Sequence, residues 1–580
     1  SWGELSIAPG MAIFIKEISE SLQQAKKQGL QFAIFNSCSG ISIAESLINL
    51  GLSQVAVMRE PINNKVAQEF LAQFIRSLTE YKDVHQSLLD ASQFLKQQEK
   101  QLTYPSAYFI PSLFCHPEAD LFRIKPFGFW EHLKQWLPKK REAIALSALI
   151  LISLPLSVQG WLLDRRVLLQ SIYRQLTSQV STDETPPILL VEIDNESITK
   201  AEISDPVPMD RNYLASLVDK LSQLDAKVIG IDYLLDRSHK DRADGKSDQN
   251  LASSIKKAIE RKSEGTWFVF VEYLNDRGEL FEVMPEIASL KWSLQGDMSL
   301  LNQGKYMNII SIKGAESKSL PFAYLLALSY QLKIEKIHNY PQPKLDSKQD
   351  FLNQLSDYIN KETGGNHTDL FSSASRTNWL TDMSYLLSQM WLHPIIDFSL
   401  SPKQVYNCIP AWKLLENLDD SQVNSQQKQR CNNPSLSEKL KHQVVLIIPG
   451  AYSKAGVTEG NDNINSPLAF KHWTKQDILT GGEIHAYMFH HFLNKRLVIP
   501  IPDLWMILIA ALLGKGITLI LVDSSVKPGW LIVGITSTTA VYGLVSLQLY
   551  IGTALLLPWF LPSVTLWFYI LMILRRKIHE

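Results

Sequence analysis

The sequence has few cysteines, no excess of basic residues and no glycine-rich phosphate loop. Four cysteines in 580 residues are too few for a disulfide scaffold or a cysteine-rich zinc site. A net charge of −1 argues against a nucleic-acid partner, because such proteins usually present a basic face. Gly514-Lys515-Gly516 lacks the spacing of a P-loop. We therefore expect no nucleic-acid partner and no cofactor.

The chain also lacks an initial Met and a signal peptide, since it begins at Ser1. We therefore expect a fragment or a processed form of a longer protein. At 580 residues the chain is too long for one hydrophobic core, so several domains are expected. Its apolar residues are concentrated in a few runs.

The first long apolar run is Ala143–Leu163, with 21 residues and no charge. A helix of this length rises about 30 Å, which matches the hydrocarbon core of a bilayer. We predict a transmembrane helix, with a buried core helix as the alternative, although a soluble helix this long usually has a polar face. Pro155 and Gly160 mark the expected hinge. The aromatic-rich residues 126–142 are expected to form a juxtamembrane linker.

Three more apolar runs, at 504–522, 530–550 and 551–574, predict transmembrane helices 2, 3 and 4. Because four crossings return the chain to its starting side, both termini should share a compartment. Lys515 is the one charge inside these runs. A lysine at mid-bilayer costs about 2.5–3.5 kcal/mol on insertion scales. We expect its side chain to reach the interface, with a functional role as the alternative.

Basic residues near the helix ends predict the orientation of the chain. Ten lie on the side of the termini and five on the other side. The ten are Arg123, Lys125, Lys134, Lys139, Lys140, Arg141, Lys527, Arg575, Arg576 and Lys577, and the five are Arg165, Arg166, Arg174, Lys495 and Arg496. We therefore expect an integral protein of the bacterial inner membrane, with residues 1–125 and the C-terminus in the cytoplasm and residues 165–497 in the periplasm.

Within residues 1–125, short apolar strands alternate with amphipathic helices, which predicts a layered α/β domain with a largely parallel sheet. Cys38 lies between a strand at 31–35 and a helix at 41–50. A thiol near a helix N-terminus is favoured as the thiolate, and Gly40 lets backbone N–H groups approach a reacting carbonyl. The alternative is that Cys38 is a small buried residue at a strand end.

The segments FNSCSG, AESLINLGLSQVAVMREPINNKVAQEFLAQF and YPSAYFIPSLFCHP resemble the C-terminal half of a CHAT domain, a caspase-like cysteine peptidase fold. The resemblance implies that Cys38 is the nucleophile and that a cytoplasmic protein is the substrate. The general-base His of the family would precede Cys38, but no His does so here, and His85 and His116 do not match. The domain is therefore either cut downstream of its His or degenerate, because a Cys nucleophile needs a base or a lowered pKa.

The middle of the chain begins with a predicted βαβ unit, formed by a strand at 187–194, a helix at 211–224 and a strand at 228–232. Further strands are expected at 267–273, 307–312 and 444–448, and a helix at 482–493. A long polar stretch, 333–378, has the composition of an insertion.

Asp194 and Asp232 follow two of these strands, and Asp462 follows a third. These carboxylates are candidates for a metal site or for recognition of a polar ligand. The alternative is that strand-end aspartates cap helices and turns. The nearby histidines do not have a metal-binding spacing, so we expect no metal at His485, His490 and His491.

VEIDNESI, PVPMDR, AKVIGIDYLLD, VVLIIPG followed by GNDN, and GGEIHAYMFHHFL resemble, in this order, the landmarks of the second class of CHASE domain. The resemblance covers residues 185–495 and implies an extracytoplasmic sensor whose ligand is unknown. In an oxidising periplasm, Cys408 and Cys431 would form a disulfide that closes a loop of roughly 24 residues and contributes about 3 kcal/mol. The alternative is two unpaired buried thiols.

We therefore predict a multidomain α/β membrane protein, with a caspase-like α/β fragment, one transmembrane helix, an extracytoplasmic α/β sensor domain and three C-terminal transmembrane helices. The favoured function is signal transduction in a bacterium, more narrowly a cyanobacterium, in which the sensor regulates the caspase-like module. The alternative is a non-catalytic receptor or scaffold with a degenerate peptidase domain. The expected partners are membrane lipid, an extracytoplasmic ligand, a cytoplasmic protein substrate and a second copy of the chain.

Overall fold

The computed structural model divides into two compact units, Ser1–Leu137 and Pro138–Glu580, which are described separately. The residues that it describes are 4–8, 11–35, 40–97, 106–117, 119–124, 129–179, 185–238, 246–261, 265–275, 279–299, 301–303, 306–308, 320–335, 340–362, 379–387, 389, 391–416, 431, 440–456, 462–522 and 526–579.

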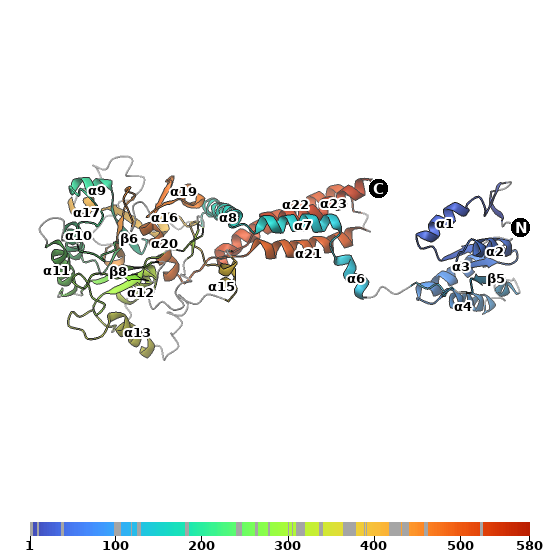
Figure 1. The fold of residues 1–580 in the computed structure, drawn as a ribbon, viewed down its shortest axis with the longest axis horizontal. Coiled ribbons are helices and arrows are strands. Elements are labelled where there is room, and N and C mark those ends of the chain that lie inside the picture. The colour runs from blue at the N-terminus through green and yellow to red at the C-terminus, as the bar shows by residue number, and fades with distance from the viewer. Residues whose placement is uncertain are drawn as a thin grey trace. The chain divides into compact units, whose positions relative to one another are not determined.

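The N-terminal unit contains a three-stranded sheet in the order β3–β4–β5. Helix α2 covers one face, while α3 and α4 cover the other (Figure 1). The bounds are β3 Phe32–Phe35, α2 Gly40–Asn49, β4 Gln54–Met58, α3 Asn64–Thr79, α4 Val84–Gln97 and β5 Pro111–Cys115. The expectation of a largely parallel sheet is wrong for β5, which runs antiparallel to β4. Two helices rather than one connect β4 to β5, so the chain re-enters the sheet at the edge where β4 ended.

The large sheet of the second unit contains six parallel strands in the order β10–β8–β7–β14–β6–β13. The bounds are β6 Ile188–Ile193, β7 Val228–Ile231, β8 Trp267–Leu274, β10 Leu294–Asp297, β13 Asn407–Pro410 and β14 Val444–Pro449, with β9 Leu280–Phe281 antiparallel to β8. Every residue of β6, β7 and β14 is buried. Such continuous burial is typical of parallel strands that have helices on both faces.

Alternate residues of β6 enter two separate hydrophobic cores. Leu189 and Val191 pack with α10 (Arg211–Gln223) and α11 (Ser247–Ile259) on one face. Ile188 and Leu190 pack with α12 (Phe322–Ser329) and α20 (Gly481–Leu493) on the other face. The sheet is therefore the middle layer of a three-layer α/β domain.

The order of the strands reverses at the centre of this sheet. After β6 the chain skips one position to β7 and continues outward to β8 and β10, whereas β14 later enters the gap between β6 and β7. Helix α11 follows β7 on one face, and α20 follows β14 on the opposite face. Adjacent parallel strands whose helices leave on opposite faces open a crevice at their carboxyl ends, which is where α/β folds bind ligands.

Two helices among the described residues are long and apolar enough to cross a membrane, or three if one bent pair counts as a span. The two are α21 (Asp503–Val522) and α22 (Pro528–Thr553). They expose large apolar side chains, including Leu512 at 60%, Ile520 at 76% and Trp530 at 70%. Exposed apolar surface of this extent is typical of contact with lipid or a partner.

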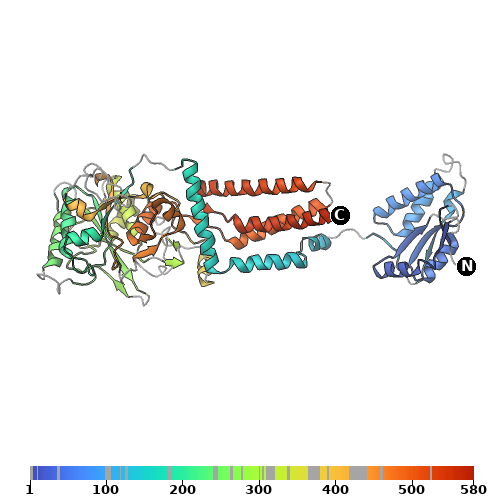
Figure 2. The same cartoon turned by 90° about the horizontal axis from the view of Figure 1, so that it is seen from above.

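The predicted first transmembrane helix, 143–163, is wrong as a single helix. The structure has α7 (Lys140–Ser153) and α8 (Leu156–Leu176), which meet at an angle of 82°. Figure 2 shows α8 crossing the direction of α7. Pro155 has no N–H to continue the helix, and the Gln159 side chain donates hydrogen bonds to the freed carbonyls of Ser153 and Leu154 at 3.1 and 2.9 Å.

The predicted boundary between helices 3 and 4, near residue 550, is also displaced. Helix α22 ends at Thr553, where Ala554 has a positive φ of 59°. Strand β18 (Leu555–Leu556) then pairs with β17 (Ile499–Pro500), before α23 begins at Phe560 and continues to His579. Because β17 directly precedes α21, this pairing holds the ends of the three C-terminal helices together.

Lys515 of α21 pairs with an acid in the first turn of α7. Its ammonium lies 2.7 Å from the carboxylate of Glu142 in α7, and both side chains are 5% exposed. The Glu142 carboxylate also accepts a hydrogen bond from the Lys139 backbone N–H at 3.0 Å. An opposite charge offsets much of the cost of burying a lysine among apolar helices, so this pair joins α7 to α21.

The remaining described α-helices and β-strands divide between the two units, and those before residue 138 belong to the N-terminal unit. These helices and strands are β1 Glu4–Ala8, β2 Met11–Phe14, α1 Ser19–Lys27, α6 Phe129–Trp136, α9 Asn195–Lys200, β11 Leu301–Gln303, β12 Tyr306–Asn308, α13 Phe351–Glu362, α15 Trp379–Leu386, α16 Pro402–Val405, α17 Ala411–Glu416, β15 Asn463–Asn465, α19 Leu468–Thr474 and β16 Ile478–Thr480. Of the strand predicted at 307–312, residues 307 and 308 belong to β12, which pairs with β11, and 309–312 lie outside the described residues.

Candidate functional site

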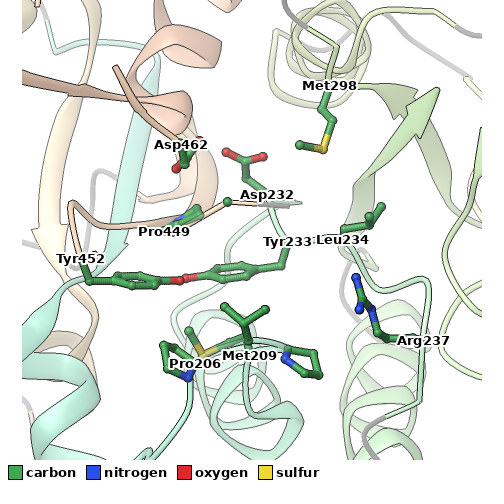
Figure 3. A pocket seen from close by; sticks show the side chains of 13 residues that line it. Pro206, Met209, Asp232, Tyr233, Leu234, Arg237, Met298, Pro449, Tyr452 and Asp462 are labelled. Carbon is green, nitrogen blue, oxygen red and sulfur yellow. The ribbon is translucent and has the colours of Figure 1, made fainter. Parts of the chain in front are cut away.

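A pocket of about 70 Å³ lies at the carboxyl ends of β7 and β14, in the crevice that the strand order predicts. We call it the Asp232 pocket. Its lining residues are Pro206, Val207, Pro208, Met209, Asp232, Tyr233, Leu234, Arg237, Met298, Pro449, Tyr452, Gly456 and Asp462. Figure 3 shows Asp232 and Asp462 near one another above the rings of Tyr233 and Tyr452. The pocket therefore combines two acids with an aromatic floor.

The fold positions both carboxylates through the backbone. Asp232 follows the last residue of β7, and its N–H donates to the carbonyl of Ile447 in β14 at 2.9 Å. Asp462 lies beside the N-terminus of α20, where its carbonyl accepts from the N–H of Gly481 at 3.2 Å. A Cβ at Gly481 would lie 2.0 Å from an oxygen of the Asp462 carboxylate, so only glycine leaves room for this acid.

Burial and repulsion from nearby carboxylates control the ionisation of the two acids, since Asp462 acts on Asp232 and Glu483 acts on Asp462. Burial raises the pKa of Asp232 well above its usual range, and the charge of Asp462 raises it further. Burial also raises the pKa of Asp462 to about 6, against the lowering effect of the Gly481 N–H. A nearby like charge disfavours ionisation. At neutral pH the pair therefore holds protons more strongly than two exposed aspartates would.

His485 lies behind this pair in α20, with its Nε2 atom 3.8 Å from the Asp232 carboxylate. Burial lowers the pKa of His485 to about 4, so its ring is neutral at pH 7 and supplies no positive charge. The phenol oxygens of Tyr233 and Tyr452 point toward one another below the acids (Figure 3), and burial raises the pKa of Tyr452 to about 12. The pocket is thus acidic, with neutral aromatic walls.

The structure separates Asp194 from this pair. The Asp194 carboxylate accepts from the backbone N–H and the hydroxyl of Ser197 at 2.8 and 2.7 Å, and so caps α9. The alternative of helix capping therefore describes Asp194, which is not among the residues that line the Asp232 pocket, and its ligand role stays a prediction. A cap at this position satisfies backbone donors that the first helical turn leaves unpaired.

Cys408 and Cys431 are joined by a disulfide, with their sulfurs 3.5 and 3.4 Å from a carboxylate oxygen of Glu192. Within the described part of the chain, these three residues are the group whose side chains approach closely enough to hold a metal ion. The disulfide removes both thiolates, which are the form that binds metal. The group is therefore a covalent link between β13 and the segment before β14.

Cys38 lies outside the described residues, between the end of β3 at Phe35 and the start of α2 at Gly40. Gly40 is buried, and a Cβ there would lie 2.3 Å from the carbonyl oxygen of Met58 in β4. Glycine is therefore required by the close approach of α2 to β4. Of the predicted peptidase residues, the structure thus describes the position of Gly40, and its role toward a substrate stays a prediction.

A second buried cluster, which the sequence did not reveal, centres on Asp397. One oxygen of its carboxylate accepts from the hydroxyl of Tyr550 in α22 at 2.5 Å and from the N–H of Ser399 at 2.9 Å. The other lies 3.5 Å from the guanidinium of Arg174 in α8. His491 of α20 accepts from the Asp397 N–H at 2.8 Å. We call these five residues the Asp397 network.

The network joins the large α/β domain to α8 and α22. Asp397 is fully buried, and although burial raises its pKa, the charge of Arg174 and the other partners hold that pKa below its usual range. Helix α8 makes further contacts on both sides. Its residues Asp164 and Arg166 bind the N–H of Leu468 and the carboxylate of Asp503, which begins α21. From the sequence, Arg174 counted only as a basic residue that flanks a membrane helix, because its partner Asp397 is far away in the sequence.

The CHASE2 domain family matches residues 143–521. The chain belongs to the CHASE2 family. CHASE2 domains are extracellular sensors typical of signal-transduction receptors, and with two candidate membrane spans this indicates a membrane protein. The match begins in α7 and ends in α21, so the family unit includes the bent helix pair and one span as well as the α/β domain. No curated protein and no solved structure matches the chain.

Proposed function

We propose that this CHASE2 protein is a transmembrane receptor that binds a ligand in the Asp232 pocket and transmits a change through α8 to the membrane helices. A cytoplasmic caspase-like module, residues 1–125, then receives the signal. The observation that carries this proposal is the Asp397 network, because one carboxylate contacts both Arg174 of α8 and Tyr550 of α22. A shift in either helix must therefore disturb a buried charge of the sensor domain.

The proposed topology has four crossings, with both termini in the cytoplasm and the sensor domain outside. Helices α7 and α23 contact α21, and α22 contacts α23, so the four pack as one bundle. Helix α7 has 14 residues and rises about 21 Å, which is short for a span and needs the bend at Pro155 to lie near the outer interface. The excess of basic residues near the termini supports this orientation.

The proposed chemistry of the module is attack of the Cys38 thiolate on a peptide carbonyl. A histidine from outside residues 1–37 would take the thiol proton, and backbone N–H groups near Gly40 would hold the oxyanion. Cys38 follows β3 at its carboxyl end and precedes α2, which is the edge where α/β folds place reactive residues. The alternative is a receptor or scaffold that cleaves no peptide.

Transmission can be tested through the reactivity of Cys38. In the Cys115→Ser background, Cys38 is the one cysteine outside the disulfide, so iodoacetamide reports its thiolate fraction. We expect Tyr550→Phe, which removes the hydroxyl contact to Asp397, to change the alkylation rate in nanodiscs at least about threefold. Asp194→Asn is the matched control and should leave it unchanged. An unchanged rate in Tyr550→Phe would refute transmission through the network.

The peptidase and the topology have separate tests. Cleavage of casein by the protein should disappear in Cys38→Ala, and cleavage that persists would favour the receptor or scaffold. In intact cells, a membrane-impermeant maleimide should leave the exposed thiol of Cys115 unlabelled. Labelling of Cys115 before permeabilisation would overturn the proposed orientation.

A further inference from the structure

The Asp232 pocket contains polar atoms that the protein itself leaves without partners. The Asp232 side chain is 5% exposed, and among the described segments the nearest basic group, the ring of His485, lies 3.8 Å from its carboxylate, beyond hydrogen-bond distance. The Oδ2 atom of Asp462 is fully buried and also has no partner among them. Leaving buried acceptors unpaired costs free energy that most folds avoid. Asp232 and Asp462 both line one cavity, so a molecule inside it can satisfy their carboxylates.

The described side chains around the acids do not supply the missing positive charge. His485 is the nearest basic group at 3.8 Å, and burial keeps its ring neutral. Arg237 also lines the pocket, but its side chain is 58% exposed and pairs with Asp236 at 3.3 Å. The remaining walls near the acids are the rings of Tyr233 and Tyr452 and the thioether of Met298 (Figure 3).

We propose that Asp232 and Asp462 bind a small primary ammonium ion, which makes an amine the ligand class of this sensor. This inference rests on the proposed function, because it identifies what occupies the same pocket. The ammonium group donates charge-assisted hydrogen bonds to both carboxylates, and its short alkyl part lies against Met298 and the tyrosine rings. Aromatic faces attract organic cations, and a cavity of about 70 Å³ admits a molecule of only a few heavy atoms.

A metal ion fits the pocket less well. Calcium takes six to eight oxygen ligands and zinc about four N, S or O ligands. Among the described residues, no third His, Cys, Asp or Glu joins Asp232 and Asp462 at ligand distance. The aromatic and thioether walls also offer nothing that a hard cation prefers. An ammonium ion needs only two or three acceptors, which is what the pocket presents.

Binding should tighten as the pH rises from about 5 to about 7.5, because the acids must ionise to hold a cation. Ethylammonium itself stays protonated over this range. The ionisable groups that face the pair are His485 and Glu483 from α20, Tyr233 and Arg237 after β7, and Tyr452 after β14. His485 and the two tyrosines are neutral throughout this range. Among the carboxylates, Asp232 and Asp462 line the pocket and Glu483 does not, so we assign the pH dependence to Asp232 and Asp462.

The test is calorimetric titration of the full chain in nanodiscs with ethylammonium chloride, at ionic strength matched with sodium chloride. We expect saturable binding that weakens at least about tenfold in Asp232→Asn and in Asp462→Asn, since each loses a charged acceptor. Asp194→Asn, at the end of the neighbouring strand, should bind like the wild type. Equal binding in Asp232→Asn, or no saturable binding of ethylammonium, would refute the proposal.

Three other probes identify the alternatives. Calcium chloride that binds in an Asp232-dependent way, where ethylammonium does not, would overturn the amine in favour of a metal. If ethanol bound with the same affinity as ethylammonium, the ligand would not need a positive charge. If acetate bound and ethylammonium did not, the pocket would select an anion. Either result would overturn the proposal. None of these results bears on signal transmission from the sensor domain to residues 1–125. The Cys38 alkylation rate measures that transmission, and it is measured without any ligand. Failure of the ligand class and failure of the receptor function are therefore distinguishable.

Discussion

Asp232 and Asp397 are both buried carboxylates of one sensor domain, with exposures of 6% and 0%, yet their surroundings are opposite. Asp397 contacts Ser399, Tyr550 and Arg174, and its pKa is lowered. The nearest basic group to Asp232 among the described residues, the ring of His485, lies 3.8 Å away, and the pKa of Asp232 is raised. Removing one member of a buried ion pair leaves the other charge uncompensated, so the fold depends on Asp397. An unsatisfied charge at the edge of a cavity costs stability and marks a site for a ligand.

The largest expected effect is the loss of Asp397. Asp397→Ala should lower the free energy of unfolding by about 3–5 kcal/mol, because it leaves Arg174 buried and unpaired. Urea unfolding of the full chain in detergent micelles, followed by tryptophan fluorescence, measures this change. A loss below about 1 kcal/mol would show that water or a nearby group replaces the carboxylate, and the contrast with Asp232 would then disappear.

The second-largest expected effect is the pH dependence that Asp232 and Asp462 give to the free energy of unfolding. Carboxyls with a raised pKa bind protons more tightly in the folded state, so their contribution to stability is present at low pH and is lost as the pH rises through the folded pKa. For Asp462 that value is about 6. As the pH rises from about 5 to about 8, the free energy of unfolding of the wild type should fall by about 1–3 kcal/mol relative to that of the double variant Asp232→Asn, Asp462→Asn.

The same urea unfolding series at several pH values measures this difference. Asp397 titrates below this window in both proteins, since its pKa is lowered from 3.8, and therefore does not contribute. A difference that stays constant with pH, or a wild type that gains stability relative to the double variant as the pH rises, would contradict the raised pKa values and with them the contrast between the two clusters.

The smallest expected effect concerns Asp194, the third aspartate of the comparison. Asn is as good an N-cap as Asp, so Asp194→Asn should change the free energy of unfolding by less than about 0.5 kcal/mol. Asp194→Ala should cost about 1 kcal/mol in the same assay, because the Ser197 N–H loses its acceptor. If Asp194→Asn were as damaging as Asp397→Ala, the carboxylate charge would matter beyond capping.

Much of the α/β domain followed from hydrophobic patterning. The expected strand at 228–232 is β7, the expected helix at 211–224 is α10 and the helix at 482–493 is α20, each within one or two residues. Continuous apolar runs identify buried parallel strands because both faces of such strands are covered. The polar stretch 333–378 was harder to interpret. Part of it forms α13, in which Phe351 and Leu355 enter the core.

The membrane helices show where patterning fails. The run at 143–163 has the length and composition of a straight span, but Pro155 interrupts it, and the side chains of Gln159 and Gln389 donate hydrogen bonds to the carbonyls at the bend. Lys515 had no visible partner because Glu142 lies 373 residues away in sequence. Hydropathy counts residues along one helix, whereas the ion pair depends on which helices pack together.

The sequence by itself determined that strand ends carry aspartates, that apolar runs exist for membrane helices and that Cys38 lies between a strand and a helix. Only the tertiary structure decided which aspartates meet. Asp232 and Asp462 become neighbours because β14 enters the sheet beside β7 and carries the Asp462 segment with it, while Asp194 turns to cap α9. Capping is a local interaction that the chain makes within three residues, whereas a pocket depends on long-range strand order, which hydrophobic patterning leaves open.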